Sequence, residues 1–312
     1  MTDLHLFAAS GVELRNQSIQ RARKRLKKWG FSVTLDASAR ARHQRFAGAD
    51  AVRLETLYRI ADAAPSVALA CRGGYGLTRL LDALDWQRIA RSVDQGTRWV
   101  GYSDMTALQL GLLAHTGRTS WHGPMAADDF GWEPTDSSDA LALEQVEMRE
   151  ITAECFVQAL SGELEAVGFK TESGFDGLDV NGVLWGGNLA MVSSLLGTPH
   201  WPHIKNGILF LEDVNEHPYR IERALLQLAQ AGVLQNQKAV LLGQFSDWRP
   251  SPLDRGYHFK HAVAAVRHAV KVPILTGFPF GHVPLKLTVP IGVGVQLVVQ
   301  GRDVLVGWEH NA

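Results

Sequence analysis

The feature that most constrains the fold of this chain is the alternation of short apolar runs with longer amphipathic stretches through its first half. Strand character is found in the runs "LHLFAAS", "FSVTLD", Val67–Cys71 and Trp99–Tyr102. Helical patterns between and after them cover "VELRNQSIQRARKRLKKWG", Ala49–Ala64, "GLTRLLDAL" and Asp104–His115. This alternation predicts parallel strands joined by right-handed crossovers, with helices on both faces of the sheet.

Sheets of this kind bind ligands beyond the carboxyl ends of their strands. Two segments of the first half fall at such ends, namely the glycine-rich turn Gly73–Gly76 and the serine Ser103. We therefore expect the chemistry of the first half to be concentrated in these two segments.

The character of the sequence changes between Asp128 and Gly177, where acidic and Ser/Thr-rich pieces flank one or two helical patterns. We expect a connection between two domains here. The chain closes with "PIGVGVQLVVQGRDVLVGW", whose alternation and glycines are typical of a hairpin. The expected organisation is a first domain over residues 1–130, a connecting segment over 131–177 and a second domain over 178–312.

Composition excludes several classes of protein. The 31 Lys and Arg residues balance 32 Asp and Glu residues, so nothing indicates a nucleic-acid partner. The two cysteines, Cys71 and Cys155, lie far apart, which argues against a disulfide scaffold or a thiolate zinc site. The sequence shows neither a signal peptide nor an apolar run of membrane-spanning length. These features predict a cytoplasmic protein with no membrane partner.

The stretch "WVGYSDMTALQLGLLAH" allows two interpretations of Ser103. Serine and aspartate are favoured as helix N-caps, because their side-chain oxygens accept an unpaired backbone N–H. Alternatively, a tight strand-to-helix bend exposes the hydroxyl as a nucleophile, with the next backbone N–H facing the developing oxyanion. The second glycine of the G-x-S-x-G pattern is missing, so the sequence at this position leaves both interpretations open.

A serine nucleophile needs a base, and the base needs an acceptor on its other nitrogen. His282 lies in the turn-forming stretch "TGFPFGHVPLK", and Glu212 ends the apolar run "GILFLED". Both residues would therefore be presented at the ends of strands. Considered separately, each residue also has a non-catalytic interpretation: His282 as an ordinary histidine in a turn, and Glu212 as a solvent-exposed residue at the end of a strand.

The glycines in "ACRGGYGLTRLL" let the backbone approach a substrate closely and adopt positive φ. Their N–H groups could complete an oxyanion hole or hold a phosphate. A purely structural turn is the alternative for such a short glycine pattern.

Together these segments resemble the LD-carboxypeptidase family, the serine peptidases that include muramoyltetrapeptide carboxypeptidase and the microcin-immunity hydrolases. The matching pieces, in family order, are "CRGGYG", "GYSDMTAL", "WHGPM", "GVLWGGNL", "LFLEDVNEHPYRIER" and "GFPFGH". The resemblance implies an α/β fold, with an N-terminal flavodoxin-like parallel sheet flanked by helices and a smaller, β-rich C-terminal α/β domain. It also implies a homodimer.

By this resemblance, Ser103 corresponds to the nucleophile, Glu212 to the carboxylate of a catalytic triad and His282 to its general base. The backbone amides of Gly74 and Asp104 correspond to the oxyanion hole. The first domain would then carry the nucleophile, and the second domain would carry the triad glutamate and histidine.

The sequence departs from the family in "FAASGV", which lacks the Pro-Ser usual after the first strand. The resemblance therefore does not extend to substrate contacts near Ala9 and Ser10. A carboxypeptidase must also recognise a free α-carboxylate, which calls for a cation or a helix N-terminus. Arg72, beside the glycines, is one candidate, and a structural ion pair is the alternative for its side chain.

The implied reaction is hydrolysis of an L,D-peptide bond, releasing the terminal D-alanine of murein tetrapeptides, free or glycan-linked, in peptidoglycan recycling. This prediction includes no cofactor and no metal. One alternative within the family is hydrolysis of toxic microcin-like aminoacyl-nucleotide conjugates. An alternative of another class is a non-catalytic nucleotide-binding module built on the GG-x-G turn.

Overall fold

The computed structural model describes residues 1–134 and 139–309, which form two compact units. The first unit contains Met1–Leu164, Thr198–Pro202 and Pro284–Ile291. The second contains Glu165–Gly197, His203–Val283 and the chain from Gly292 onward. The stretch 131–177, expected as a connection, contributes a long helix to the first unit and a strand to the second.

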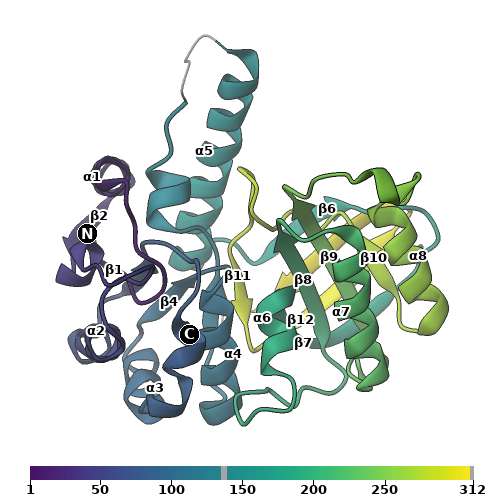
Figure 1. Ribbon diagram of the computed structural model, residues 1–312, viewed down its shortest axis with the longest axis horizontal. Helices are drawn as coiled ribbons and strands as arrows, with labels where there is room; N and C mark the ends of the chain where they lie inside the picture. Colours follow the sequence, from purple (N-terminus) through teal and green to yellow (C-terminus); the bar gives the residue numbers. More distant parts are fainter. Residues whose placement is uncertain (135–138, 310–312) are drawn as a thin grey trace. The chain divides into compact units, whose positions relative to one another are not determined.

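The first unit is built on a six-stranded sheet whose strand order is β2-β1-β3-β4-β5-β11. Figure 1 labels β1, β2, β4 and β11 of this sheet. Its strands are β1 (Thr2–Phe7), β2 (Phe31–Leu35), β3 (Val67–Ala70), β4 (Arg98–Gly101), β5 (Ser120–His122) and β11 (Val289–Ile291). Strands β1 to β5 are parallel, and β11 pairs antiparallel to β5. The order 2-1-3-4-5 is that of flavodoxin-like sheets, which confirms the fold predicted for this part of the chain.

Five α-helices belong to the described part of the first unit: α1 (Asn16–Lys28), α2 (Asp50–Ala63), α3 (Trp86–Asp94), α4 (Met105–Thr116) and α5 (Ala140–Ser161). Shorter helical turns are η1 (Ala37–Arg40), η2 (Leu77–Arg79), η3 (Leu81–Ala83) and the π-type turn η4 (Ala126–Phe130). The single helix expected in "GLTRLLDAL" is therefore wrong, because the segment forms two 3₁₀ turns. Asp85 caps α3 by accepting from the Arg88 N–H, so the chain leaves helical geometry at Leu84.

Hydrophobic spacing explains how the helices pack. In α1 the buried residues Ile19, Ala22 and Leu26 recur at intervals of three and four, and they pack against the sheet in the main core cluster. Helix α4 is instead buried along almost its whole length, from Met105 to Leu113. A helix that is buried all round is held rigidly, and α4 begins two residues after Ser103.

The second unit is built on a seven-stranded sheet whose strand order is β10-β9-β8-β7-β12-β13-β6. Its strands are β6 (Ala166–Lys170), β7 (Asp179–Asn188), β8 (Ile208–Val214), β9 (Ala239–Ser246), β10 (Ile274–Thr276), β12 (Val293–Gln300) and β13 (Asp303–Trp308). Strands β7 to β10 are parallel to one another, whereas β12, β13 and β6 pair antiparallel. The antiparallel pairing of β12 with β13 confirms the predicted C-terminal hairpin.

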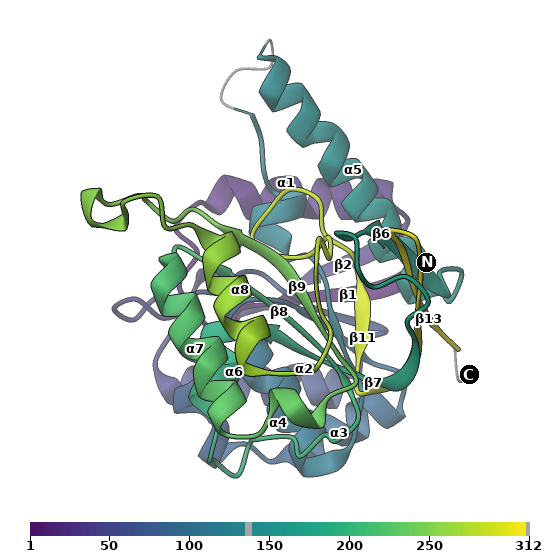
Figure 2. The same cartoon turned by 90° about the vertical axis from the view of Figure 1, so that its right-hand side faces the viewer.

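The helices of the second unit are α6 (Leu189–Leu195), α7 (Pro218–Gln230) and α8 (Phe259–Ala269), with short turns η5 (Leu234–Asn236) and η6 (Pro252–Asp254). Figure 2 shows α6, α7 and α8 together over one face of the parallel part of this sheet. Strand β8 accordingly begins with a fully buried apolar run, Ile208–Leu211. The strand order brings the carboxyl ends of β7 and β8, at Asn188 and Glu212, next to each other. In the part of the chain that the structure describes, no helix combines the length and apolarity needed to cross a membrane.

The close packing of α4 on α3 gives a testable prediction for stability. A Cβ atom at Gly111 would lie 2.4 Å from Cη2 of the buried Trp86 ring. We expect Gly111→Ala to lower the free energy of unfolding by about 1–3 kcal/mol through overpacking, despite the better helix propensity of alanine. Chemical denaturation measures the change. Gly294→Ala is the control, because a Cβ there meets nothing within 4 Å; equal stability of the two variants would contradict the prediction.

Candidate active site

In the first unit, Ser103 lies on a strained bend between β4 and α4. Its φ is +61°, a left-handed conformation that few residues other than glycine adopt. The bend is held by two backbone hydrogen bonds, from the Met105 N–H to the Tyr102 carbonyl and from the Thr106 N–H to the Ser103 carbonyl. The residue that caps α4 is Asp104, and it makes no side-chain capping hydrogen bond. Ser103 is therefore not an N-cap; its backbone has the geometry of a nucleophile elbow.

The glycine turn after β3 packs directly against this bend. A Cβ atom at Gly73 would lie 2.8 Å from the Cβ and 2.9 Å from the Oγ of Ser103, so only glycine fits without displacement. The same position is 3.5 Å from the backbone nitrogen of Asp104. Gly74 follows with a φ of +106° and is exposed to solvent. The turn thus brings Gly73 and Gly74, Ser103 and the Asp104 amide together within the first unit.

Two buried side chains hold the glycine turn in place. The Asp104 carboxylate accepts the Leu77 N–H at 2.9 Å, which joins the bend to the end of the turn. Arg53 is fully buried and donates to the carbonyls of Gly76 and Ala9, both at 2.8 Å. Burial raises the pKa of Asp104, and the hydrogen bond from Leu77 opposes that effect. Sequence reasoning missed both side-chain roles, because Arg53 lies in an ordinary helical pattern and Asp104 was considered only for its amide.

In the second unit, Glu212 and His282 form a hydrogen-bonded pair. The Nδ1 atom of His282 lies 2.8 Å from Oε2 of Glu212, whose side chain is completely buried in β8. With the Nδ1–H of His282 donating to the Glu212 carboxyl group, Nε2 is the ring nitrogen that would take up a proton. The His282 side chain remains partly exposed, at 18%. The pair therefore has the orientation required of a general base and its supporting carboxylate.

Sequence reasoning also missed two residues beside this pair, Asn188 and Asp213. The Asn188 side-chain amide donates to Oε1 of Glu212 at 3.2 Å and to Oδ1 of Asp213 at 3.0 Å. Asp213 further accepts the N–H groups of Ala190 and Val214, at 2.9 and 2.8 Å. Burial, and secondly the neighbouring Glu212, raise the pKa of Asp213 to about 6. The segment "FLED" carried a signal for this cluster, since two adjacent carboxyl groups that are both buried need hydrogen-bond donors.

The side chains of Cys71, His200 and Trp185 are held in structural surroundings. Burial raises the pKa of the Cys71 thiol far above its ordinary range, which disfavours the reactive thiolate. His200 contacts His115 and Asp82, at 2.9 and 3.0 Å. Trp185 is fully buried and donates to Gln237. Within residues 1–134 and 139–309, no three histidine, cysteine or acidic side chains are grouped as they would be around a metal ion.

Comparison with known proteins identifies the family. Residues 4–123 match the family model described as the LD-carboxypeptidase N-terminal domain, and residues 181–297 match the one described as the LD-carboxypeptidase C-terminal domain. The chain belongs to the LD-carboxypeptidase family. The resemblance identified from the sequence, and the two-part α/β fold that it implied, are thereby confirmed.

Relatives within the LD-carboxypeptidase family cover most of the chain. The murein tetrapeptide carboxypeptidase of Pseudomonas aeruginosa is 30% identical over 83% of this chain and 81% of its own. The crystal structure of muramoyltetrapeptide carboxypeptidase from Oxalobacter formigenes is 34% identical, covers 99% of both chains and has a TM-score of 0.85. The microcin C7 self-immunity protein of Escherichia coli is 26% identical over 75% of this chain and 71% of its own.

The raised pKa of Asp213 predicts how pH affects stability. The carboxyl titrates near pH 4 in the unfolded chain and near pH 6 in the folded one. The folded state therefore binds the Asp213 proton more tightly than the unfolded state does. The free energy of unfolding is highest below pH 4 and falls by up to about 3 kcal/mol as pH rises through 6. Relative to Asp213→Asn, the wild type should lose this amount between pH 4 and 7 in denaturation experiments.

The control for this prediction is Asp303→Asn, which removes an exposed carboxylate on β13. We expect its stability to follow the pH dependence of the wild type. If Asp213→Asn also followed the wild type throughout this range, Asp213 would have an ordinary pKa and the prediction would be wrong.

Proposed function

We propose that the chain is a serine carboxypeptidase that removes the terminal D-alanine from murein tetrapeptides by hydrolysing an L,D-peptide bond. The observation that carries the proposal is the left-handed bend at Ser103, packed against the side-chain-free backbone of Gly73. Such a bend, which is strained for serine, is typical of a nucleophile elbow. Family membership and relatives named as murein tetrapeptide carboxypeptidases support the substrate class.

In the proposed mechanism, Ser103, Glu212 and His282 act as a triad. Nε2 of His282 takes the proton from the Ser103 hydroxyl as its oxygen attacks the carbonyl carbon of the scissile bond. The hydrogen bond between Nδ1 and Glu212 holds the imidazole in the required tautomer and stabilises the imidazolium. The N–H groups of Gly74 and Asp104 stabilise the oxyanion.

Release of D-alanine and hydrolysis of the acyl-enzyme then complete the cycle. His282 gives its proton to the amine of the departing D-alanine, which leaves an acyl ester on Ser103. Water, deprotonated by His282, attacks this ester. As the ester bond breaks, His282 returns the proton to the Ser103 oxygen and the tripeptide is released. All proton transfers use groups of this chain, so the proposed steps need no cofactor.

We further propose that the enzyme acts in the cytoplasm on recycled murein fragments, free or glycan-linked, and works as a homodimer. The cytoplasmic location is supported by two buried cysteines, Cys71 and Cys155, which are both free thiols. The dimer rests on the resemblance to the family. Light scattering of the purified chain measures its mass, and a monomer at micromolar concentration would refute the dimer.

The relationship to the microcin C7 self-immunity protein favours a second candidate, hydrolysis of an aminoacyl-nucleotide conjugate. A structure of that immunity protein holds glutamyl sulfamoyl guanosine and shares this fold, with a TM-score of 0.84 at 21% identity. Both reactions would use the same nucleophile. Parallel assays with a murein tetrapeptide and an aminoacyl sulfamoyl nucleoside separate the two candidates.

The product of the first candidate reaction is directly measurable. Incubation of the purified chain with a murein tetrapeptide should give the tripeptide and free D-alanine, detected by mass spectrometry. Release of a dipeptide, or an unchanged tetrapeptide under conditions in which the protein is folded, would refute the proposed substrate.

Replacement of the nucleophile tests the mechanism. We expect Ser103→Ala to lower kcat by a factor on the order of 10⁴ to 10⁶, because the acyl-enzyme cannot form. The fold should persist, since alanine only removes a hydroxyl. Ser194→Ala, at an exposed serine of α6, is the control and should retain full activity. Substantial turnover by Ser103→Ala would rule out this nucleophile.

A further inference from the structure

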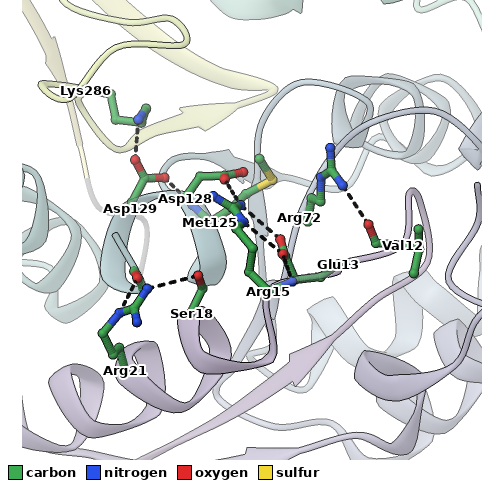
Figure 3. Close-up of polar contacts among 11 residues, drawn as sticks. Val12, Glu13, Arg15, Ser18, Arg21, Arg72, Met125, Asp128, Asp129 and Lys286 are labelled. Atoms are coloured by element: carbon green, nitrogen blue, oxygen red, sulfur yellow. Dashed lines mark hydrogen bonds and ion pairs between the residues drawn. The ribbon is translucent and has the colours of Figure 1, made fainter. Parts of the chain in front are cut away.

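Figure 3 labels four cationic side chains of the first unit, namely Arg15, Arg21, Arg72 and Lys286. Arg21 pairs with the Glu133 carboxylate at 3.0 Å. Arg15 is neutralised by two carboxylates, with Glu13 at 3.0 Å and Asp128 at 2.5 Å. The hydrogen bond to Glu13 is the main reason why the pKa of Arg15 is raised. Arg15 therefore has no charge to offer a substrate.

Lys286 is also neutralised. Its ammonium group pairs with the Asp129 carboxylate, and both side chains are almost completely buried. The other carboxylate oxygen of Asp129 accepts the Met125 N–H, and the ammonium lies 4.8 Å from the centre of the Tyr102 ring. A buried ion pair of this kind is structural, because separating it would leave an unpaired charge inside the protein.

Arg72 differs from these cations. Its Nη1 donates to the backbone carbonyl of Val12 at 2.6 Å, and no carboxylate of the described residues forms an ion pair with it. Glu13 is adjacent to Val12, but its two oxygens are occupied by the backbone and guanidinium of Arg15. The ion pair that was one alternative for Arg72 is therefore absent from this part of the structure, and Arg72 keeps a net positive charge while half-buried.

The backbone of Arg72 lies next to the glycine turn that packs against Ser103. Arg72 immediately precedes Gly73, and a Cβ atom added at Gly73 would lie 2.9 Å from the Ser103 Oγ. A guanidinium has five N–H donors, and the hydrogen bond to Val12 uses only one of its nitrogens. The planar fork matches a carboxylate in a bidentate arrangement, and partial burial strengthens the attraction.

We propose that the Arg72 guanidinium binds the free α-carboxylate of the terminal D-alanine and so restricts the enzyme to the last residue of the peptide. This inference rests on the proposed carboxypeptidase function and names the group that recognises the substrate's end. Glu13, Asp128 and Asp129 contribute by holding Arg15 and Lys286. Unlike Arg15 and Lys286, Arg72 has no ion-pair partner among the described residues and can offer its charge to a carboxylate.

The test compares two substrates with the full-length enzyme. One is a murein tetrapeptide ending in D-alanine, and the other is the same peptide ending in D-alaninamide, which lacks the charge. The wild type should prefer the acid, and Arg72→Gln should lower kcat/KM for the acid by about 10²-fold while leaving that for the amide unchanged. Arg72→Lys keeps the charge without the fork, and should restore part of the preference.

The amide substrate also reports on the integrity of the site. Arg45→Gln, which removes a nearby exposed charge that stacks on Tyr75, is the matched control and should keep the wild-type preference. If Arg72→Gln lowers kcat/KM for acid and amide equally, Arg72 is structural and the inference is wrong. Retention of the wild-type preference would also overturn it. If the wild type cleaves neither peptide, the proposed function itself fails.

Discussion

The contact between the Gly73 backbone and Ser103 is the constraint on which the rest of the first unit depends. The left-handed backbone of Ser103 is unfavourable for a serine, so the surrounding structure must hold it in place. Below it, α4 is buried on all sides; beside it, the Asp104 carboxylate and the buried Arg53 fix the glycine turn. Rigid packing and buried hydrogen bonds thus maintain the left-handed backbone of Ser103, which serine does not favour on its own.

In the second unit, two adjacent carboxyl groups are buried, which is unfavourable unless hydrogen-bond donors compensate. Glu212 and Asp213 both lie out of water, and their mutual repulsion is reduced by an amide that donates to each of them. The α6 N-terminus adds a further donor through Ala190. With Asn188 holding Oε1, the other oxygen of Glu212 remains available to His282. Glu212 thus orients the imidazole directly, and Asn188 supports that role by holding the other oxygen of Glu212.

Patterns of apolar residues were enough to predict the parallel sheet, most of the helices beside it and the terminal hairpin, because these follow from local periodicity. The left-handed backbone of Ser103 could not be predicted in this way, since no residue type at that position signals positive φ. The contacts of Arg53 and Asp213 were missed because their partners are distant in sequence. For Glu212 and His282, 70 positions apart, ordered family segments provided the information that periodicity lacked. For Arg72, the sequence left two alternatives, a carboxylate-binding role and a structural ion pair. The structure decides between them in part because the neighbouring Glu13 carboxylate binds Arg15.

The path of the chain has a consequence for how the protein can be divided. The first sheet ends in β11, a strand that the chain supplies only after most of the second unit has been made. A fragment that stopped at Leu164 would leave β5 as an open edge with unpaired backbone groups. Such edges recruit strands from other molecules. The first sheet is therefore complete only once Ile291 has been synthesised, after most of the second unit, and the edge of β5 stays open until then.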